Sequence, residues 1–431
     1  MHNLNDAIDK LAEQFIACFP EQKPQHRTVG REAEYPIVRS DGQAADGRRI
    51  LEHLRATYQM EAQYDTNVPN LIVGLQSVAC NYALEVGVGT LELNTPPTQT
   101  LWDVEQSIID GVQKVVRAAA SYSWQVLGYG IQPVSPPSLQ IMAPKQRYQS
   151  LYRAMGASWL WYTVTASDQC HVAIGQPELV QMLNVGNMIA PVLIALCGNS
   201  PIFGGRRSPF CSAREGRMVD IHATEHRHGM PLRPYTSIGD YVHAVSQSTY
   251  LILKAGGEII PSHQPFTEYL REHGPDFNAF LYHEHYIWNS ARLRTVHGTV
   301  EIRPACQQPW AEQMAAAALT VGLMEAAAQI ESFVQEELGP DYWERMRTYH
   351  QQTIRHGLAA PQPLPDFLTQ LVAFANAALE RRGHGEEKLL TSIYNRLFRR
   401  QNPAQRARQV YEIDGMQGLL RHTAIRPEVI H

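Results

Sequence analysis

The sequence predicts an α+β protein, with a strand-rich N-terminal two thirds that carries inserted helices and a helical C-terminal third. Three observations lead to this fold class. Residues 28–38 alternate around two glutamates in the manner of a half-buried strand. The stretches 71–95 and 283–304 alternate in the same way around glycine turns, which is typical of hairpins. From 310 to 421 the apolar residues recur with a helical period instead.

Local signals place the other elements of the strand-rich part. A helix is expected over 5–19, because apolar side chains recur on one face until a proline ends the period. A turn is expected at 41–47, and a double proline marks the break before a helix at 101–120. Further along the chain we expect a strand at 164–174, a helix at 177–196 and a loop rich in Gly, Ser and Arg at 199–216.

The C-terminal third is predicted to consist of helices. They are expected at 310–337, where a Gly-Pro pair stops the apolar period, and at 365–382, 386–399 and 403–421. We expect a single domain over 1–431, in which a helical part at 311–431 packs on a sheet-rich core at 25–310.

The composition excludes several classes of protein. Hydrophobic residues make up 44% of the chain and charged residues 18%, as in globular proteins. The net charge is -5, and no Lys/Arg block could neutralise a row of phosphates, so no nucleic-acid partner is expected. No run approaches the roughly 18 apolar residues of a membrane span, so no membrane is expected. The six scattered cysteines lack zinc spacing, and we expect reduced thiols in the cytoplasm.

Four glutamates lie in strands that are otherwise largely apolar. Glu32 and Glu34 project from the same face of one strand, about 7 Å apart, because side chains alternate along a strand. In the hairpin at 82–94, a turn at 88–89 would place Glu85 directly opposite Glu92. Like charges at these separations destabilise a sheet unless a cation such as magnesium binds between them. The alternative is four carboxylates on ordinary solvated strand faces.

The second hairpin carries three arginines and one glutamate. A tight turn at 297–298 would place Arg294 opposite Glu301 and Arg292 opposite Arg303, all on one face. Two opposed guanidinium groups would repel each other unless an anion lies between them, and phosphate or carboxylate fits. The alternative is a surface ladder of ion pairs. A metal site beside a guanidinium clamp is what phosphoryl transfer requires.

Several short motifs resemble, in their order along about residues 28–310, the glutamate-cysteine ligases of the plant, cyanobacterial and bacterial type and the related bacterial carboxylate-amine ligases. The segments that carry the resemblance are Gly30-Arg31-Glu32-Ala33-Glu34, Leu84-Glu85 with Leu91-Glu92-Leu93, Lys145-Gln146-Arg147-Tyr148, Thr165 to Val172, Asn199-Ser200-Pro201 with Ser212-Ala213-Arg214, and Gly298 to Arg303. Each motif alone is weakly specific, but the ordered set is fairly specific.

The resemblance implies a fold like the catalytic domain of glutamine synthetase, in which a curved antiparallel sheet cups ATP and metal ions and helices cover its outer face. The cofactors implied are ATP and Mg²⁺, with Mn²⁺ as an alternative. The implied metal ligands are Glu32, Glu34, Glu85, Glu92 and Glu301. The implied catalytic residues are Glu301, Arg303, Arg292 and Arg294. The residues implied to contact the nucleotide are Glu34, Gln169, His171, Arg214 and Arg303.

The activity that the resemblance implies is an ATP-dependent ligation of a carboxylate to an amine. Glutamate, or a similar acid, would be activated as an acyl phosphate and attacked by cysteine or another amine, with release of ADP and phosphate. This is a step of glutathione biosynthesis, and a homodimer is compatible with the resemblance. Cys306 replaces an aspartate that many members carry, which leaves the identity of the amine open. The ligase chemistry needs no thiol, so Cys306 is not expected to be a catalytic group.

Two other functions remain open from the sequence. A phosphotransferase similar to the guanidino kinases would use the same cup but stop at phosphoryl transfer. A catalytically silent binding protein would keep the fold without the reaction. The complete set of five glutamates argues against the silent protein, because unpaired acidic charge inside a sheet is costly without a cation.

Overall fold

The computed structural model describes residues 2–221 and 227–429. Its centre is a ten-stranded sheet in which all neighbouring strands pair antiparallel. Eight strands follow the order β14 (Ala291–Arg294), β15 (Thr299–Ile302), β7 (Asp168–Ala173), β1 (Val29–Val38), β5 (Thr90–Asn94), β4 (Asn81–Leu84), β3 (Ile72–Gln76) and β2 (Glu61–Tyr64). Strand β6 (Gln125–Leu127) pairs with the far end of β1 and with β16 (Ala424–Ile425), so the last described strand joins the same sheet.

Strand β1 separates a functional face from a structural face. Its side chains alternate as the sequence predicts, so Glu32 and Glu34 project to one side of the sheet. The intervening Arg31, Ala33 and Tyr35 are buried on the other side. The charged face is therefore available for a site, while the opposite face is available for a helical layer.

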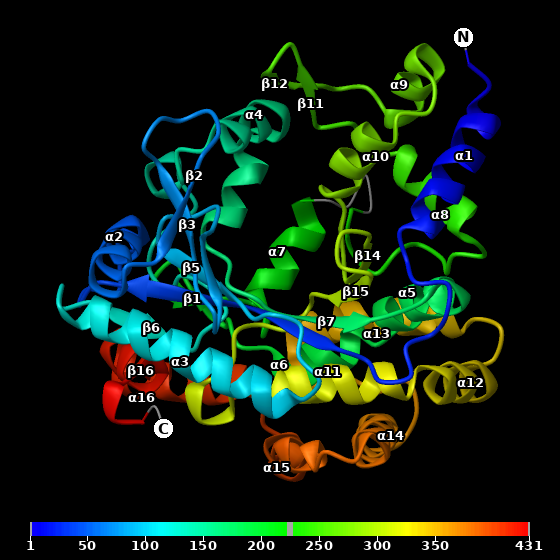
Figure 1. Cartoon of the computed structure of the whole chain (residues 1–431). Helices are drawn as coiled ribbons and strands as arrows, with labels where there is room; N and C mark the ends of the chain where they lie inside the picture. The colour runs from blue at the N-terminus through cyan, green and yellow to red at the C-terminus, as the bar shows by residue number, and fades with distance from the viewer. Residues whose placement is uncertain (1, 222–226, 430–431) are drawn as a thin grey trace.

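Helices cover the structural face. Helix α3 (Leu101–Ala120) packs on β1 and β5, and α11 (Ala315–Glu325) packs on β7. Figure 1 shows both helices lying along the same side of the sheet, with α14 (Phe367–Arg382) beyond α11. Ten of the eleven residues of α11 are buried, which explains its Ala-rich sequence: small side chains let it lie between the sheet and α14.

Other segments rise around the functional face, as Figure 1 shows for α4 (Gln146–Met155), α7 (Ala213–Ile221) and α10 (Phe277–Glu284). A 3₁₀ segment, Gly156–Thr163, continues α4 over the sheet. The remaining elements are α1 (Leu4–Ala17), α2 (Gly47–Tyr58), α5 (Leu179–Met188), α6 (Ala190–Cys197), α8 (Ile238–Ser246), α9 (Phe266–His273), α12 (Ala327–Leu338), α13 (Tyr342–His356), α15 (Thr391–Arg399), α16 (Pro403–Thr423), β8 (Ile202–Phe203), β9 (Arg206–Arg207), β10 (His228–Gly229), β11 (Ile252–Ala255), β12 (Glu258–Pro261) and β13 (Trp288–Asn289).

Most predicted elements are confirmed, but the long ones are interrupted. The helix predicted at 310–337 is wrong as one element, because α11 and α12 meet at a bend of 76°. Alanine stands on both sides of that bend, so only the tertiary packing decides it. The helix predicted at 177–196 is divided into α5 and α6, whose second residue is a proline that lacks an N–H for a preceding turn. Part of the loop predicted at 199–216 forms the hairpin β8–β9 and the start of α7, and the helix predicted at 386–399 begins as a 3₁₀ turn.

Among the described residues, one helical segment is long and apolar enough to cross a membrane by length and composition, and a second passes only if a bent pair counts as one span. The first, Gln176–Cys197, contains α5 and α6, and 83% of its most apolar window is buried inside the molecule. The second would need the bent pair α11 and α12 to act as one span. The sequence analysis expected no membrane partner because it counted only consecutive apolar residues, and those runs are shorter than a membrane span. The core position of the first segment explains its apolar character without a membrane.

A buried ion pair ties the structural face to the C-terminal helices. The Arg31 guanidinium donates to both carboxylate oxygens of Asp168 on β7, at 2.7 and 2.8 Å, and to the side-chain and backbone oxygens of Gln313. The side chains of Arg31 and Asp168 are 0% and 1% exposed. Because β1 and β7 also carry Glu32 and Gln169 on the functional face, this pair holds the two strands directly behind the site.

We expect Asp168→Ala to lower the free energy of unfolding by about 3–5 kcal/mol, because it leaves the Arg31 charge buried without its anion. Urea denaturation measures this change. The exposed pair between Arg207 and Glu412 provides the control, and Glu412→Ala should cost at most about 1 kcal/mol. Equal losses in the two variants would contradict a special role for the buried pair.

Candidate active site

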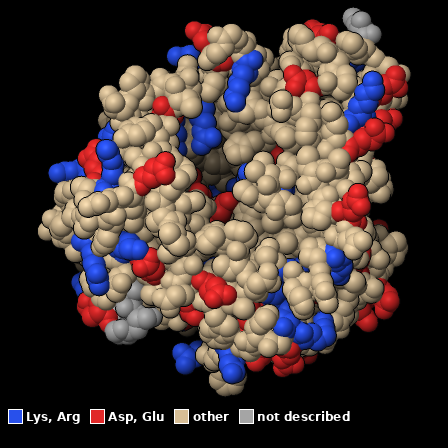
Figure 2. Space-filling model, viewed as in Figure 1, with Lys and Arg blue, Asp and Glu red and all other residues tan. Residues whose placement is uncertain are grey.

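The functional face contains a cavity of about 290 Å³, bounded below by residues of β1, β5, β7 and β14 and by Arg303, which follows β15. Figure 2 shows the molecule hollowed near the centre of this view, with acidic and basic side chains inside the hollow. A neighbouring cavity of about 570 Å³ lies over the other end of β1 and shares Glu32 and Glu92 with the first. The residues that line the first cavity are Glu32, Glu34, Glu85, Val86, Glu92, Arg147, Tyr148, Trp159, Tyr162, Thr165, Gln169, Arg214, Met218, His228, His285, Tyr286, Trp288, Arg292, Arg294 and Arg303.

A first group of carboxylates forms where β1 pairs with β5. Glu34 lies opposite Glu92, and ligand oxygens of Glu34, Glu85 and Glu92 all lie within 4.8 Å of one another. Glu34 also accepts hydrogen bonds from the backbone N–H and hydroxyl of Ser167, at 2.7 and 2.6 Å. Burial and the charge of Glu85 raise the pKa of Glu34 to about 7. Burial and the charges of the neighbouring glutamates raise the pKa of Glu92 well above its usual range. A cation would offset this repulsion, so the group fits a metal ion.

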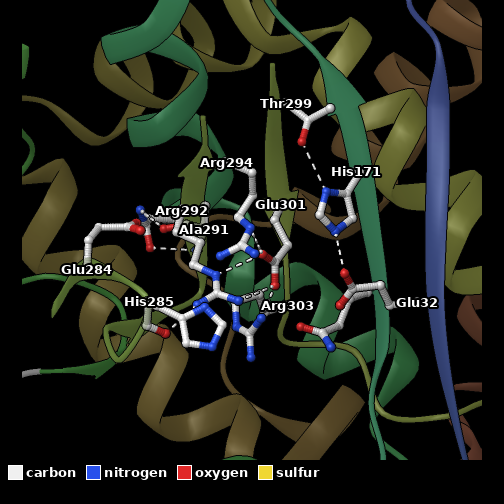
Figure 3. A network of polar contacts seen from close by, with 12 residues as sticks. Glu32, His171, Glu284, His285, Ala291, Arg292, Arg294, Thr299, Glu301 and Arg303 are labelled. Atoms are coloured by element: carbon white, nitrogen blue, oxygen red, sulfur yellow. Dashed lines mark hydrogen bonds and ion pairs between the residues drawn. The ribbon is translucent and has the colours of Figure 1, made fainter. Parts of the chain in front are cut away.

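A second group contains an imidazole. Ligand atoms of Glu32, His171 and Glu301 lie within 4.8 Å of one another. Figure 3 shows His171 between Glu32 and Thr299, with its ring nitrogens 3.0 Å from an oxygen of each. Burial opposes ionisation of Glu32, but the neighbouring His171 outweighs it and lowers the pKa of this carboxyl. Oxygen and imidazole donors at this spacing also fit a divalent cation.

Three guanidinium groups converge on Glu301, which is 0% exposed (Figure 3). Arg292 donates to both carboxylate oxygens at 2.7 and 3.2 Å, Arg294 lies 3.3 Å from one of them, and Arg303 donates to the other. Burial and the adjacent Arg292 lower the pKa of Arg303. One buried carboxylate therefore orients three cationic side chains at the wall of the cavity.

The register predicted for the arginine hairpin is wrong by two residues. Arg292, not Arg294, lies opposite Glu301, and Arg294 lies opposite Thr299. Arg303 lies beyond the paired part of β15. The reason is a four-residue loop at 295–298, closed by the left-handed Gly298, in place of the tight two-residue turn. A shift of two residues keeps every side chain on its predicted face, so the arginines still reach the cavity.

The register predicted for the first hairpin is also wrong by two. Glu92 lies opposite Ala83, while the backbone N–H of Glu85 donates to Thr90. The loop at 86–89 is longer than a two-residue turn because it forms backbone hydrogen bonds with the segment 141–143. It also passes so close to the carbonyl of Thr163 that a Cβ on Gly87 would lie 1.9 Å from that oxygen. The glutamates meet all the same, because Glu92 faces Glu34 on the next strand.

The other predicted residues lie as follows. Gln169 donates to Glu34 at 3.2 Å, and Arg214 lines the cavity while it donates to Glu215. His171 lines the neighbouring cavity, and Glu301 lies beneath the arginines. Cys306 is fully buried against the hydroxyls of two serines, Ser200 and Ser212, and does not line the cavity. The geometry brings the predicted residues together, and their individual roles in metal or nucleotide binding stay predictions.

The sequence interpretation missed the wall that faces the sheet. This wall includes Arg147 and aromatic rings from α4, from 156–163 and from 285–288. The signal was present in the sequence as closely spaced Trp and Tyr residues at 156–163 and 285–288. His285 also belongs to it, and burial among arginines, Arg292 first, lowers the pKa of its imidazole well below the usual range.

Comparison with known proteins identifies the family. The model of glutamate-cysteine ligase family 2 matches residues 28–422. The chain belongs to this family. This member is 24% identical over 360 residues to the chloroplastic glutamate–cysteine ligase of Medicago truncatula, which covers 79% of this chain and 69% of that protein. It is 26% identical over 148 residues to a putative glutamate–cysteine ligase 2 of Chloroflexus aurantiacus, which covers 34% and 37% of the two chains.

The fold is shared with a solved structure. The crystal structure of glutamate–cysteine ligase from Francisella tularensis in complex with AMP matches with a TM-score of 0.57 and 11% identity, and covers 94% of this chain and 88% of that one. The predicted α+β ligase fold is thus confirmed, because a solved glutamate–cysteine ligase shares it. As a member of its family, the protein is an ATP-dependent ligase that joins a carboxylate to an amine, and its substrates are small molecules.

We expect Mg²⁺ or Mn²⁺ to raise the temperature of thermal unfolding more at pH 8 than at pH 6. The pKa of Glu34 is about 7, above the 4.5 of a free glutamate, so in the metal-free protein this carboxyl contributes stability that is lost as the pH rises toward 7. A bound cation restores that stability above pH 7, whereas below it a proton competes for the same oxygens. Titrations of Mn²⁺ followed by differential scanning fluorimetry test this, and equal shifts at both pH values would contradict it.

We expect Glu301→Gln to reduce turnover at least 100-fold and to lower the unfolding temperature. The amide has a single acceptor oxygen and no charge, and its NH₂ group donates, so it cannot balance three buried guanidinium groups, which would then separate. Steady-state phosphate release and thermal unfolding measure the two effects. Glu344→Gln removes an exposed partner of Arg347 and is the matched control, expected to leave both values unchanged.

Proposed function

We propose that the protein activates the γ-carboxyl of glutamate, or of a similar acid, as an acyl phosphate and transfers it to an amine, with release of ADP and phosphate. The observation that carries this proposal is the convergence of two groups of metal-ligand atoms and three guanidinium groups where two neighbouring cavities meet at Glu32 and Glu92. Glutamate is proposed because the relatives are glutamate–cysteine ligases. The cytosolic location and a homodimer, both expected earlier, stay predictions.

Mg²⁺, or Mn²⁺, is proposed as the metal because the donors are carboxylate oxygens with one imidazole. Glu34, Glu85 and Glu92 would hold one ion, and Glu32 and His171 would hold another with Glu301 adjacent. A bound divalent ion would supply positive charge to the phosphate oxygens of ATP. Burial and the repulsion between the glutamates raise the pKa values of Glu34 and Glu92, and the charge of Arg214 offsets this only in part at Glu34, which supports such a site. Within the described residues neither carboxyl group forms an ion pair.

The chain's own groups orient the reactants. Glu301 fixes Arg292, Arg294 and Arg303 in one cluster, so that their outer N–H groups can contact oxygens of the transferring phosphoryl group or of the acid. Gln169 orients Glu34 through its amide. Catalysis then depends on positioning and charge stabilisation, and requires no nucleophile from the protein.

The test is incubation with ATP, Mg²⁺, glutamate and a panel of amino acids, with products identified by mass spectrometry. We expect ADP, phosphate and a γ-glutamyl amide in equal amounts. With hydroxylamine as the amine, we expect a γ-glutamyl hydroxamate, because this small nucleophile traps an activated carboxyl. A phosphorylated guanidino compound without amide would instead favour the phosphotransferase, and no ATP consumption with any acid would favour a silent binding protein.

We expect Arg303→Lys to lower kcat/KM for ATP or for the acid about 10- to 100-fold. Lysine keeps the charge but cannot contact Glu301 and a substrate oxygen with separate N–H groups of one rigid plane. Steady-state kinetics with each substrate varied measures the loss. Arg207→Lys, on the exposed hairpin β8–β9, is the control and should retain full activity. Retained activity in Arg303→Lys would remove this guanidinium from the reaction.

A further inference from the structure

The wall of the cavity that faces the sheet is aromatic. Trp159 and Tyr162 have ring centroids 4.7 Å apart, and Tyr162 and Trp288 have centroids 4.8 Å apart. Tyr148 extends this set at 5.7 Å from Trp159. We call these four residues the aromatic wall. The rings come from the continuous segment 146–163, which contains α4, and from β13, so two separate segments of the chain bring them together beside a site for charged substrates.

A guanidinium group stands at the edge of the aromatic wall. Arg147 lies over the ring of Tyr148, with Cζ 5.0 Å from its centroid, and donates to its hydroxyl at 3.2 Å. The other arginines of the cavity are paired, three of them with Glu301 and Arg214 with Glu215. Within residues 2–221 and 227–429, Arg147 forms no ion pair. The cavity therefore presents, next to an apolar surface, a guanidinium group that forms no ion pair, although the carboxyl group of Glu85 in the same cavity also acts on it.

The two cavities adjoin each other. Both contact Glu32 and Glu92, so a phosphoryl group held there can be reached from either side. The cavity of about 570 Å³ is the larger and suits a nucleoside triphosphate. The cavity of about 290 Å³, which carries Arg147 and the aromatic wall, suits an amino acid. A carboxylate beside Arg147 would place the side chain of such an amino acid against the rings.

We propose that the amine substrate is an α-amino acid with an aromatic side chain, whose carboxylate pairs with Arg147 and whose side chain packs on the aromatic wall. This inference rests on the proposed ligase function and deepens it. Aromatic side chains gain free energy from ring contacts beyond the area that they bury. Cysteine and alanine, being small, leave the wall unfilled.

The proposed ligation balances as follows. The amine nitrogen attacks the carbonyl carbon of the acyl phosphate, the C–N bond forms and the C–O bond to the phosphoryl group breaks. The ammonium group of the free amino acid loses two protons in all. One leaves with the phosphate as hydrogen phosphate, and the other goes to solvent. No oxidant, reductant or further co-reactant is required.

The first experiment is a competition with the full-length protein, ATP, Mg²⁺ and glutamate. Phenylalanine, tyrosine, tryptophan, cysteine and alanine are supplied at equal concentration, and the γ-glutamyl products are quantified by mass spectrometry. We expect aromatic products to exceed the cysteine and alanine products at least 10-fold, the scale of discrimination that an apolar pocket achieves. A preference for cysteine would overturn the aromatic assignment and leave the ligase function intact.

The second experiment separates carboxylate binding from ring binding. Arg147→Gln should lower kcat/KM at least 10-fold for phenylalanine but less than 2-fold for phenethylamine, which has the same ring and no carboxylate. Arg153→Gln, an exposed arginine on the same helix, is the matched control and should affect neither. Equal losses for both amines in Arg147→Gln would overturn the pairing of this arginine with the carboxylate.

The third experiment tests the aromatic wall. Trp159→Leu should reduce the preference for phenylalanine over alanine at least 5-fold, and Trp159→Phe should keep most of it, which guards against a simple folding defect. If Trp159→Leu instead raises KM for ATP and leaves the amine preference unchanged, the wall binds the nucleotide and the proposal is overturned. Absence of an amide with every amine, while the wild-type protein binds Mg-ATP, would overturn the ligase function itself.

Discussion

The constraint on which the site depends is the crowding of carboxyl groups on one face of a sheet. Glu34 lies directly opposite Glu92, with Glu85 close to both, and burial together with their mutual repulsion raises the pKa of Glu34 and of Glu92. Such an arrangement costs stability in the metal-free protein, so its persistence in a well-packed fold points to a positive ligand. The rest of the site is consistent with such a ligand, because a bound cation and the nearby arginines would attract phosphate oxygens.

The two faces of the sheet divide the tasks of holding and reacting. On the structural face, the buried pair of Arg31 and Asp168 joins β1 to β7 and to the segment before α11. On the functional face, Glu301 gathers three guanidinium groups without a metal. In the Arg31–Asp168 pair and in the Glu301 cluster, the buried charges have partners of opposite sign, which is the condition under which ion pairs remain in a protein interior. A rigid, preorganised arrangement of this kind is what a reaction that depends on positioning requires.

Strand periodicity explains why the site could be predicted from the sequence although its pairings could not. The alternation of side chains put Glu32, Glu34, Arg292 and Arg294 on the correct face. Both hairpin registers were wrong by two residues, because loops of four residues replace the expected two-residue turns. The length of the first loop depends on contacts with 141–143, which are distant in the sequence. A register shift of an even number of residues leaves each side chain on the same face of the sheet, so the predicted site residues still lie together.

The sequence by itself determined the types of most elements, the face on which each charged side chain lies, and the motifs that belong to glutamate-cysteine ligase family 2. These features depend on neighbours two to four residues away, where local geometry is decisive. Only the tertiary structure decided that Arg292 faces Glu301, that α11 and α12 separate at a bend, and that rings from two distant segments form a wall beside Arg147. Those outcomes depend on contacts between distant segments, whose free energies override local preference.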